Sequence, residues 1–157
     1  MEQLTTPSYR SYQGGYFRTL IAPEQTGEAL AILELTLPRG AEPPPHIHTH
    51  EDEAFYVVKG EMAVTVAGTT TLLKAGEALF APKNVPHSFR ILTENATLLN
   101  LITPGQLWNY FIEFSQPLSE APGTVAAAGP PPPDVLKRMV DVITDTYKVI
   151  FIQPNNS

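Results

Sequence analysis

The sequence predicts an all-β fold, a sandwich or barrel, followed by one amphipathic helix. Two observations predict it. Many short β-branched and aromatic segments are separated by turn residues up to residue 114, and the hydrophobic period changes after residue 133. A chain of 157 residues with 43% hydrophobic residues is long enough for one domain with a substantial core. We expect the barrel in residues 1–115, a Pro/Ala/Gly-rich linker in residues 116–133, and the C-terminal helix and tail in residues 134–157.

The expected strands are ended by glycine, proline or short polar turns. Gly60 ends one strand, Pro82 ends another, and no helical period intervenes between the strands. We expect strands at residues 16–21, 29–37, 55–59, 62–66, 70–73, 78–81, 88–93, 97–103 and 108–114, the last of them rich in aromatic residues. Residues 1–15 are expected to form an arm or an edge segment.

The hydrophobic period near the C-terminus predicts a helix over residues 134–147. One helical stripe of this segment is apolar, whereas its charged residues fall on other faces. The stripe consists of Val135, Met139, Val142, Ile143 and Tyr147. A helix of this kind packs against the outside of the barrel or against a partner subunit. Residues 149–152 are expected to form a short terminal strand.

Charge and composition exclude several function classes. The net charge is −6 and the lysines and arginines do not cluster, which argues against binding to nucleic acid or to an anionic membrane surface. The chain has no cysteine, so it has neither disulfides nor thiolate metal sites. It has no apolar run long enough to cross a bilayer and no visible secretion signal. We therefore expect a soluble, cytoplasmic protein.

Three of the four histidines lie within eight residues, together with several acids. His46, His48 and His50 are followed by Glu53 and then by an apolar strand, and His87 lies beyond a second group of strands. Imidazole nitrogens and carboxylate oxygens gathered this closely suit a site where several lone pairs meet one cation. The other interpretation is a solvated polar loop, which is the better one for a single histidine.

The geometry of a strand indicates which of these side chains can meet. Side chains alternate between the two faces, so His46 and His48 can reach one metal ion from the same strand. His50 is either a third ligand or lies where the chain bends toward the next strand. Glu53 begins that next strand, and it can close on the same point if the two strands face each other. Prolines at 43–45 hold the approach to His46 extended.

The spacing of these residues resembles the two motifs of the cupin family. The first motif is Gly, five residues, His-x-His, three or four residues, Glu, six residues, Gly, and residues 40–60 match it at every spacing. The second is Gly, five residues, Pro-x-Gly, two residues, His, three residues, Asn. Residues 76–91 match it except that Asn84 replaces the glycine and Ile91 replaces the asparagine. Asparagine tolerates a positive φ better than other non-glycine residues, so we expect the turn to survive.

Residues 43–57 resemble bacterial single-domain cupins that are similar to quercetin dioxygenases. The resemblance implies a double-stranded β-helix barrel with a C-terminal amphipathic helix. It also implies one divalent transition metal held by His46, His48, Glu53 and His87. The metal is Fe, Mn, Ni, Co, Cu or Zn, because this ligand set does not choose among them. By the same resemblance Glu53 is the catalytic residue, which both binds the metal and accepts a proton from a substrate hydroxyl.

The expected substrate pocket lies beside the metal. Alternation places two apolar side chains on the face of Glu53 and one on the face of His87, although core packing is the simpler role for any one of them. The candidates are Phe55, Val57 and Phe89, with His50 as a polar member. The aromatic residues Trp108, Tyr110 and Phe111 are expected to close the pocket mouth or to form a dimer contact. A homodimer is expected, because such cupins are often dimers and exposed strand edges favour pairing.

Three functions remain open at this stage. The first is a metal-dependent dioxygenase that uses O2 and a small aromatic or enolic substrate. The second is a non-redox metal-dependent isomerase, cyclase or lyase that acts on a sugar or a polyketide-like compound. The third is a cupin that binds a small molecule without turnover. A fold that hosts many chemistries does not decide among them, and the resemblance favours the dioxygenase.

Overall fold

The computed structural model of this chain describes residues 8–153, so the start of the expected N-terminal arm and the end of the expected tail lie outside the described residues. The fold is mostly β, with two antiparallel sheets arranged as the expected double-stranded β-helix. The larger sheet has, in spatial order, β11 (Gln116–Leu118), β1 (Tyr9–Tyr12), β2 (Gly15–Ile21), β3 (Ala31–Pro38), β10 (Asn95–Thr103), β5 (Asp52–Lys59) and β8 (Ala78–Ala81). The smaller sheet has β12 (Ile150–Phe151), β4 (His46–Ile47), β9 (His87–Ile91), β6 (Glu61–Val66) and β7 (Thr69–Lys74).

The hydrophobic core lies between the inner faces of these two sheets. Alternate residues of β3 point inward, and Leu33 and Leu35 are buried there. Met62 and Val64 of β6 contribute the same alternation from the smaller sheet. Each sheet buries the apolar side chains of one face against the other sheet. This removal of apolar surface from water is the main contribution to the free energy that holds the two sheets together.

The short helix α1 (Trp108–Glu113) corrects one sequence-based expectation. Residues 108–114 were expected to form an aromatic strand, but they continue from the 3-10 helix η2 (Gly105–Leu107) as a helix. Tyr110 is buried in this helix. The centroid of its ring lies 5.9 Å from that of Tyr147, and its hydroxyl donates to the Met139 carbonyl at 3.4 Å. Packing against the C-terminal segment therefore overrides the strand preference of these aromatic residues.

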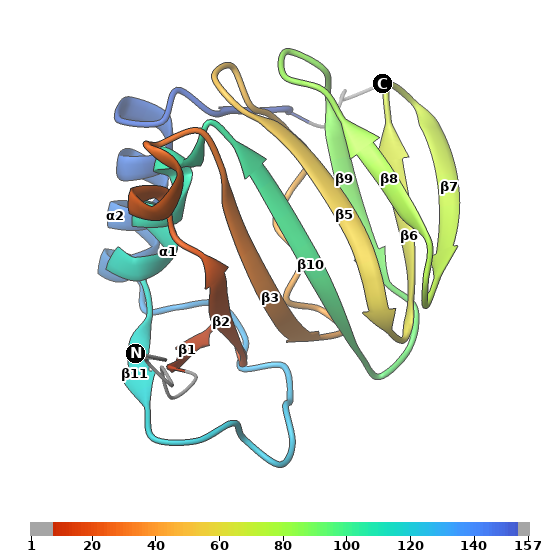
Figure 1. Cartoon of the computed structure of the whole chain (residues 1–157), viewed down its shortest axis with the longest axis vertical. Helices are drawn as coiled ribbons and strands as arrows, with labels where there is room; N and C mark the ends of the chain where they lie inside the picture. Colours follow the sequence, from red (N-terminus) through yellow and green to blue (C-terminus); the bar gives the residue numbers. More distant parts are fainter. Residues whose placement is uncertain (1–7, 154–157) are drawn as a thin grey trace.

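The C-terminal helix α2 (Pro133–Asp145) is present as expected. It begins at a proline, whose fixed φ suits the first helical position. Its buried Met139 faces the barrel, and Figure 1 shows α2 and α1 together at one side of the sheets. Arg138 of α2 forms an ion pair with Glu113 of α1 at 2.7 Å.

The chain returns to the barrel after α2. Strand β12 pairs antiparallel with β4, and Phe151 lies opposite His46 in the register. The segment 116–133 was expected to be a linker, but it begins with strand β11, which pairs with β1. The Pro/Ala/Gly-rich composition of the segment does not predict this strand. Among residues 8–153, no helix combines the length and apolar character needed to cross a bilayer.

Candidate metal centre

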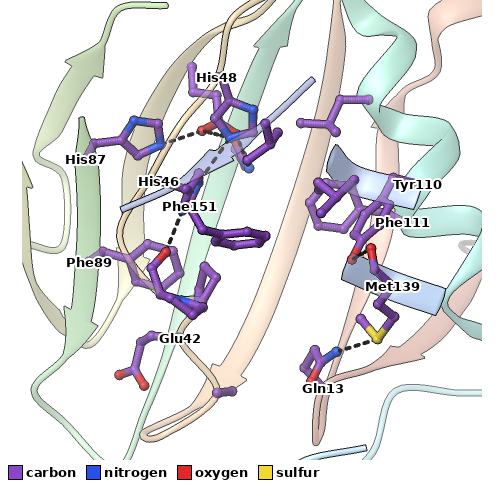
Figure 2. A pocket seen from close by; sticks show the side chains of 18 of the residues that line it. Gln13, Glu42, His46, His48, His87, Phe89, Tyr110, Phe111, Met139 and Phe151 are labelled. Carbon is purple, nitrogen blue, oxygen red and sulfur yellow. Dashed lines mark hydrogen bonds and ion pairs between the residues drawn. The ribbon is translucent and has the colours of Figure 1, made fainter. Parts of the chain in front are cut away.

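Four polar side chains meet between the two sheets. His46 lies on β4 and His87 begins β9, and these two residues are paired across the neighbouring strands. His48 directly follows β4, whereas Glu53 comes from β5 in the other sheet. One ligand atom from each of the four lies within 4.8 Å of the others, and all four residues are buried. Figure 2 shows the three imidazole rings gathered at one end of a cavity.

The atoms that face one another are the ones that could bind a cation. The Nε2 atoms of His46 and His48 lie 3.1 Å apart. The Oε2 atom of Glu53 lies 3.2 Å from Nε2 of His48 and 3.0 Å from Nε2 of His87. Three imidazole nitrogens and one carboxylate oxygen thus point at a common centre.

The outward nitrogens of two of these rings face backbone carbonyls. Nδ1 of His46 donates to the carbonyl oxygen of Pro44 at 2.7 Å. Nδ1 of His87 faces the carbonyl of Val85 at 3.4 Å. Because a carbonyl can only accept, it holds the ring proton on Nδ1 and leaves the Nε2 lone pair directed at the centre. The rigid approach through the prolines thus fixes the orientation of His46.

The donor set fits a divalent transition metal. Without a proton or a cation between them, the lone pairs of two Nε2 atoms 3.1 Å apart repel each other. Two or three neutral imidazoles and one carboxylate are the common ligands of zinc, iron, nickel, cobalt, copper and manganese in proteins. The four residues could therefore hold one such ion, and their identity does not select which one.

Burial and neighbouring charges give these groups different protonation states in the metal-free protein. Burial lowers the pKa of His46 to about 4. Burial also disfavours the charged form of His48, but the carboxylates of Glu53 and Glu51 outweigh it and raise the pKa of His48 to about 9. The pKa of Glu53 is lowered, since His48 and His87 together overcome the effect of burial on the carboxyl group.

Asn100 is a site residue that the sequence analysis missed. It lies on the inner face of β10, where the neighbouring inward residues Leu98 and Ile102 are apolar. Its Nδ2 donates to Oε1 of Glu53 at 3.2 Å. A carboxylate only accepts, so this contact fixes the orientation of the amide and directs the second oxygen of Glu53 away from the centre. Asn100 could have been predicted from its position, because it is a polar residue on the apolar face of an alternating strand.

The bend after β4 decides the place of His50. Alternation holds from His46 to His48, but the chain then bends at Thr49 and His50. His50 is exposed, and it borders a second pocket together with Glu51 and Tyr147. His50 was expected either to be a third ligand or to lie where the chain bends, and the structure places it at the bend.

The turn before His87 has the conformation expected from its sequence. Asn84 has a φ of 64°, in the left-handed region, where the family motif has glycine. The backbone N–H of Asn84 donates to the carbonyl of His48 at 2.7 Å, which ties the two motifs together. Ile91, the other departure from the motif, is buried in the core.

The four residues open onto a cavity of about 650 Å³ between the barrel and α2. Phe55 and Phe89 line it beside the histidines, whereas Val57 is fully buried in the core and is not among the lining residues. Tyr110 and Phe111 of α1 form part of the opposite wall. The wall is completed by α2 and the segment after it, through Leu136, Met139, Val140, Ile143, Val149 and Phe151.

Trp108 has a separate role. It is not among the lining residues, and its Nε1 donates to Oγ1 of Thr19 at 2.9 Å. Of the three aromatic residues expected at a pocket mouth or a dimer contact, two thus lie at the cavity.

A family model described as the cupin domain matches residues 33–102, a range that includes all four converging residues. Residues 33–102 form a cupin domain. Three of the four converging residues lie on its strands β4, β5 and β9, and His48 directly follows β4.

The cupin domain has distant homologues among curated proteins. The chain is 25% identical over 100 residues to quercetin 2,3-dioxygenase of Bacillus subtilis, a match that covers 64% of this chain and 30% of the relative. It is 32% identical over 94 residues to polyketide synthase CurC of Streptomyces cyaneus, covering 59% and 61%. It is 35% identical over 66 residues to pectin degradation protein KdgF of Dickeya dadantii, covering 42% and 60%. The chain thus spans about a third to three-fifths of these relatives.

Solved structures support the same fold. An RmlC-like cupin from Shewanella frigidimarina superimposes with a TM-score of 0.54 at 25% identity, covering 68% of this chain and 90% of that one. KdgF from Halomonas sp. superimposes with a TM-score of 0.55 at 23% identity, covering 66% and 90%, a likeness of fold alone.

Proposed function

We propose that this protein is a metal-dependent dioxygenase of a small aromatic or enolic molecule, with His46, His48, Glu53 and His87 as the metal ligands. The observation that carries this proposal is the position of the four buried side chains in the wall of a largely apolar cavity. A ligand in the cavity would meet the metal at one end and aromatic walls along its length. The resemblance to quercetin dioxygenases supports the reaction class.

The lining of the cavity favours a neutral substrate. Its volume of about 650 Å³ lies within the range of about 300–1,000 Å³ that is usual for pockets that bind small organic molecules. Of the described residues that line it, none is lysine or arginine. An acidic sugar or a dicarboxylate could place one carboxylate on the metal ion, but any further charge would enter an apolar space without a lysine or arginine to pair with. A neutral ring system such as a flavonol meets no such cost.

The residues of this chain would bind, orient and deprotonate the substrate. A bound divalent ion supplies Lewis acidity and, when it is redox-active, electron transfer to O2. The pKa of Glu53 is lowered, so Glu53 is a carboxylate at neutral pH and can accept the proton of a substrate hydroxyl. A carboxylate of lowered pKa is a weak base, and its Oε1 is already held by Asn100. Proton transfer to Glu53 therefore requires an acidic hydroxyl, such as an enol or a phenol.

Dioxygenation is balanced without a further reductant. Both oxygen atoms of O2 enter the product, and the four electrons that this takes come from the σ and π bonds of the substrate's carbon skeleton that are broken. Phe55 and Phe89, whose ring centroids lie 5.9 Å apart, would place a flat substrate beside the histidines.

A non-redox isomerase, cyclase or lyase is the second candidate. The observation that favours it is the higher identity of the matched stretches of CurC and KdgF, at 32% over 94 residues and 35% over 66 residues, against 25% over 100 residues for quercetin dioxygenase. The same apolar cavity suits a polyketide-like substrate better than a sugar. This candidate needs the metal only as a Lewis acid.

Oxygen consumption separates the candidates. We would load the metal-free protein with Fe²⁺, Mn²⁺, Ni²⁺, Co²⁺, Cu²⁺ or Zn²⁺ and follow O2 uptake with a panel of flavonols. The dioxygenase predicts uptake of one O2 per flavonol consumed with a redox-active metal and none with Zn²⁺. Turnover under argon with Zn²⁺ supports the non-redox enzyme instead. Flavonol that binds tightly and is recovered unchanged in every sample contradicts the dioxygenase and indicates a protein that binds it without turnover.

The expected homodimer has a candidate surface on the larger sheet. Tyr56 and Val58 of β5 and Phe80 of β8 are exposed on its outer face. Strand β8 is also an edge of this sheet, so its outer backbone groups can pair with a second copy. We propose that two copies meet here. Sedimentation should give a dimer for the natural chain and a monomer for Phe80→Lys. The expected cytoplasmic location stays a prediction.

A further inference from the structure

Glu51 is a buried carboxylate behind the metal centre, and neither family motif includes it. It is 4% exposed, and its Oε2 atom lies 3.4 Å from Nδ1 of His48. The two atoms are within ion-pair distance, but their relative orientation is not that of a hydrogen bond. Neither atom has another hydrogen-bond partner among the described residues. His48 is therefore the only one of the three histidines whose outer nitrogen faces a carboxylate rather than a carbonyl.

The place of Glu51 follows from the bend after His48. Thr49 donates from its hydroxyl to the carbonyl of Lys148 at 2.8 Å, which holds the bend against the C-terminal segment. The bend returns the chain so that Glu51, three residues after His48, lies beside the same ring. A buried carboxylate is costly unless a partner compensates it, and among residues 8–153 only His48 lies within ion-pair distance of Glu51.

We propose that Glu51 is a positioning residue that accepts the Nδ1 proton of His48 and thereby directs its Nε2 at the metal ion. The proposal rests on the metal site of the proposed function. The proton on Nδ1 fixes the tautomer in which Nε2 carries the lone pair. The negative partner also makes this imidazole a stronger donor than the two that face carbonyls. Glu51 itself touches neither the ion nor the substrate.

The test compares Co²⁺ binding by the metal-free full chain with that of Glu51→Gln, which keeps the shape but removes the charge. We expect the Kd for Co²⁺ to rise about 10–100-fold and the visible absorption bands of bound Co²⁺ to shift, because the ligand field of His48 changes. The matched control is Asp52→Asn. Asp52 is the neighbouring acid, and it accepts from the backbone N–H of Lys83 instead of a ligand. Its Kd and Co²⁺ bands should equal those of the natural chain.

One outcome overturns the inference about Glu51, and a different outcome overturns the metal site on which it rests. If Glu51→Gln folds and binds Co²⁺ with an unchanged Kd and unchanged bands, Glu51 does not position His48. If the natural chain binds no Co²⁺, the metal centre of the proposed function is itself wrong. Should metal-free Glu51→Gln lose the β-sheet circular dichroism signal, Glu51→Asp takes its place, since it keeps the charge but withdraws it by one methylene group. A raised Kd with shifted bands supports the inference, and unchanged values overturn it.

Discussion

The Nε2 atom of His87 lies 3.0 Å from the Oε2 atom of Glu53, although the two residues are 34 positions apart in the chain. They also belong to different sheets, since β9 is in the smaller sheet and β5 in the larger. An ion bound between them would link the two sheets. Loss of a ligand from either sheet should therefore remove the same metal.

Replacement of His48 by alanine should abolish stoichiometric metal. The change removes one of four donors and one of the two imidazoles that face the carboxylate of Glu53. Metal analysis of the purified protein measures the effect. His50→Ala is the matched control, because His50 is exposed and lies outside the cavity. Full metal content in His48→Ala, or its loss in His50→Ala alone, would count against the ligand assignment.

Metal affinity should rise with pH through the neutral range. The pKa of His48 is raised to about 9, so its Nε2 carries a proton below that pH and an incoming ion must displace it. The affinity for Zn²⁺ should therefore increase about tenfold from pH 7 to pH 8 and level off above about pH 9. The pKa of His46 is lowered to about 4, so His46 is already neutral and adds no slope there.

Competition titrations with a chelator at several pH values measure this dependence. Calorimetry in two buffers of different ionisation enthalpy counts the released proton independently. An affinity that is equal at pH 7 and pH 8, with no proton released, contradicts the assigned state of His48.

Asn84→Ala should destabilise the protein by about 1 kcal/mol, because alanine keeps the Cβ but lacks the short polar side chain that lets asparagine tolerate the left-handed region. Asn84 has a φ of 64°, and its side chain is exposed, so the backbone conformation dominates the effect. Asn84→Gly should be at least as stable as the natural chain. Urea unfolding of the metal-free proteins measures both. Equal stability of the alanine and glycine variants would show that this turn is not strained.

Met139→Ala should cost about 2–3 kcal/mol of unfolding free energy, at the low end for a buried methionine because the side chain borders the cavity. Its loss enlarges the cavity next to Tyr110. Lys137→Ala on the exposed face of the same helix is the control and should lie within about 0.5 kcal/mol of the natural chain. A similar cost for both variants would show that the Met139 contact does not hold α2 against the barrel.

The sequence was sufficient to predict those features for which few residue types are suitable. Strand alternation indicated that His46 and His48 can meet, and the resemblance to the cupin motifs added Glu53 and His87; the structure brings all four together. Asn84 was recognisable because few residue types tolerate a positive φ.

The sequence was insufficient where tertiary contacts determine the local conformation or bring distant residues together. Residues 108–114 have the composition of a strand, but their contacts with α2 make them a helix. His50 continues the His-x-His alternation, and only the bend at Thr49 removes it. Asn100 lies far along the chain from Glu53, so their contact could not be read from local spacing.

Anomalous diffraction from crystals of the Co²⁺-loaded protein tests the central claim most directly. We predict one anomalous peak at about 2.0–2.2 Å from the Nε2 atoms of His46, His48 and His87 and from a carboxylate oxygen of Glu53. The absence of a peak among these four side chains, or a peak bound elsewhere such as at His50, would contradict the claim.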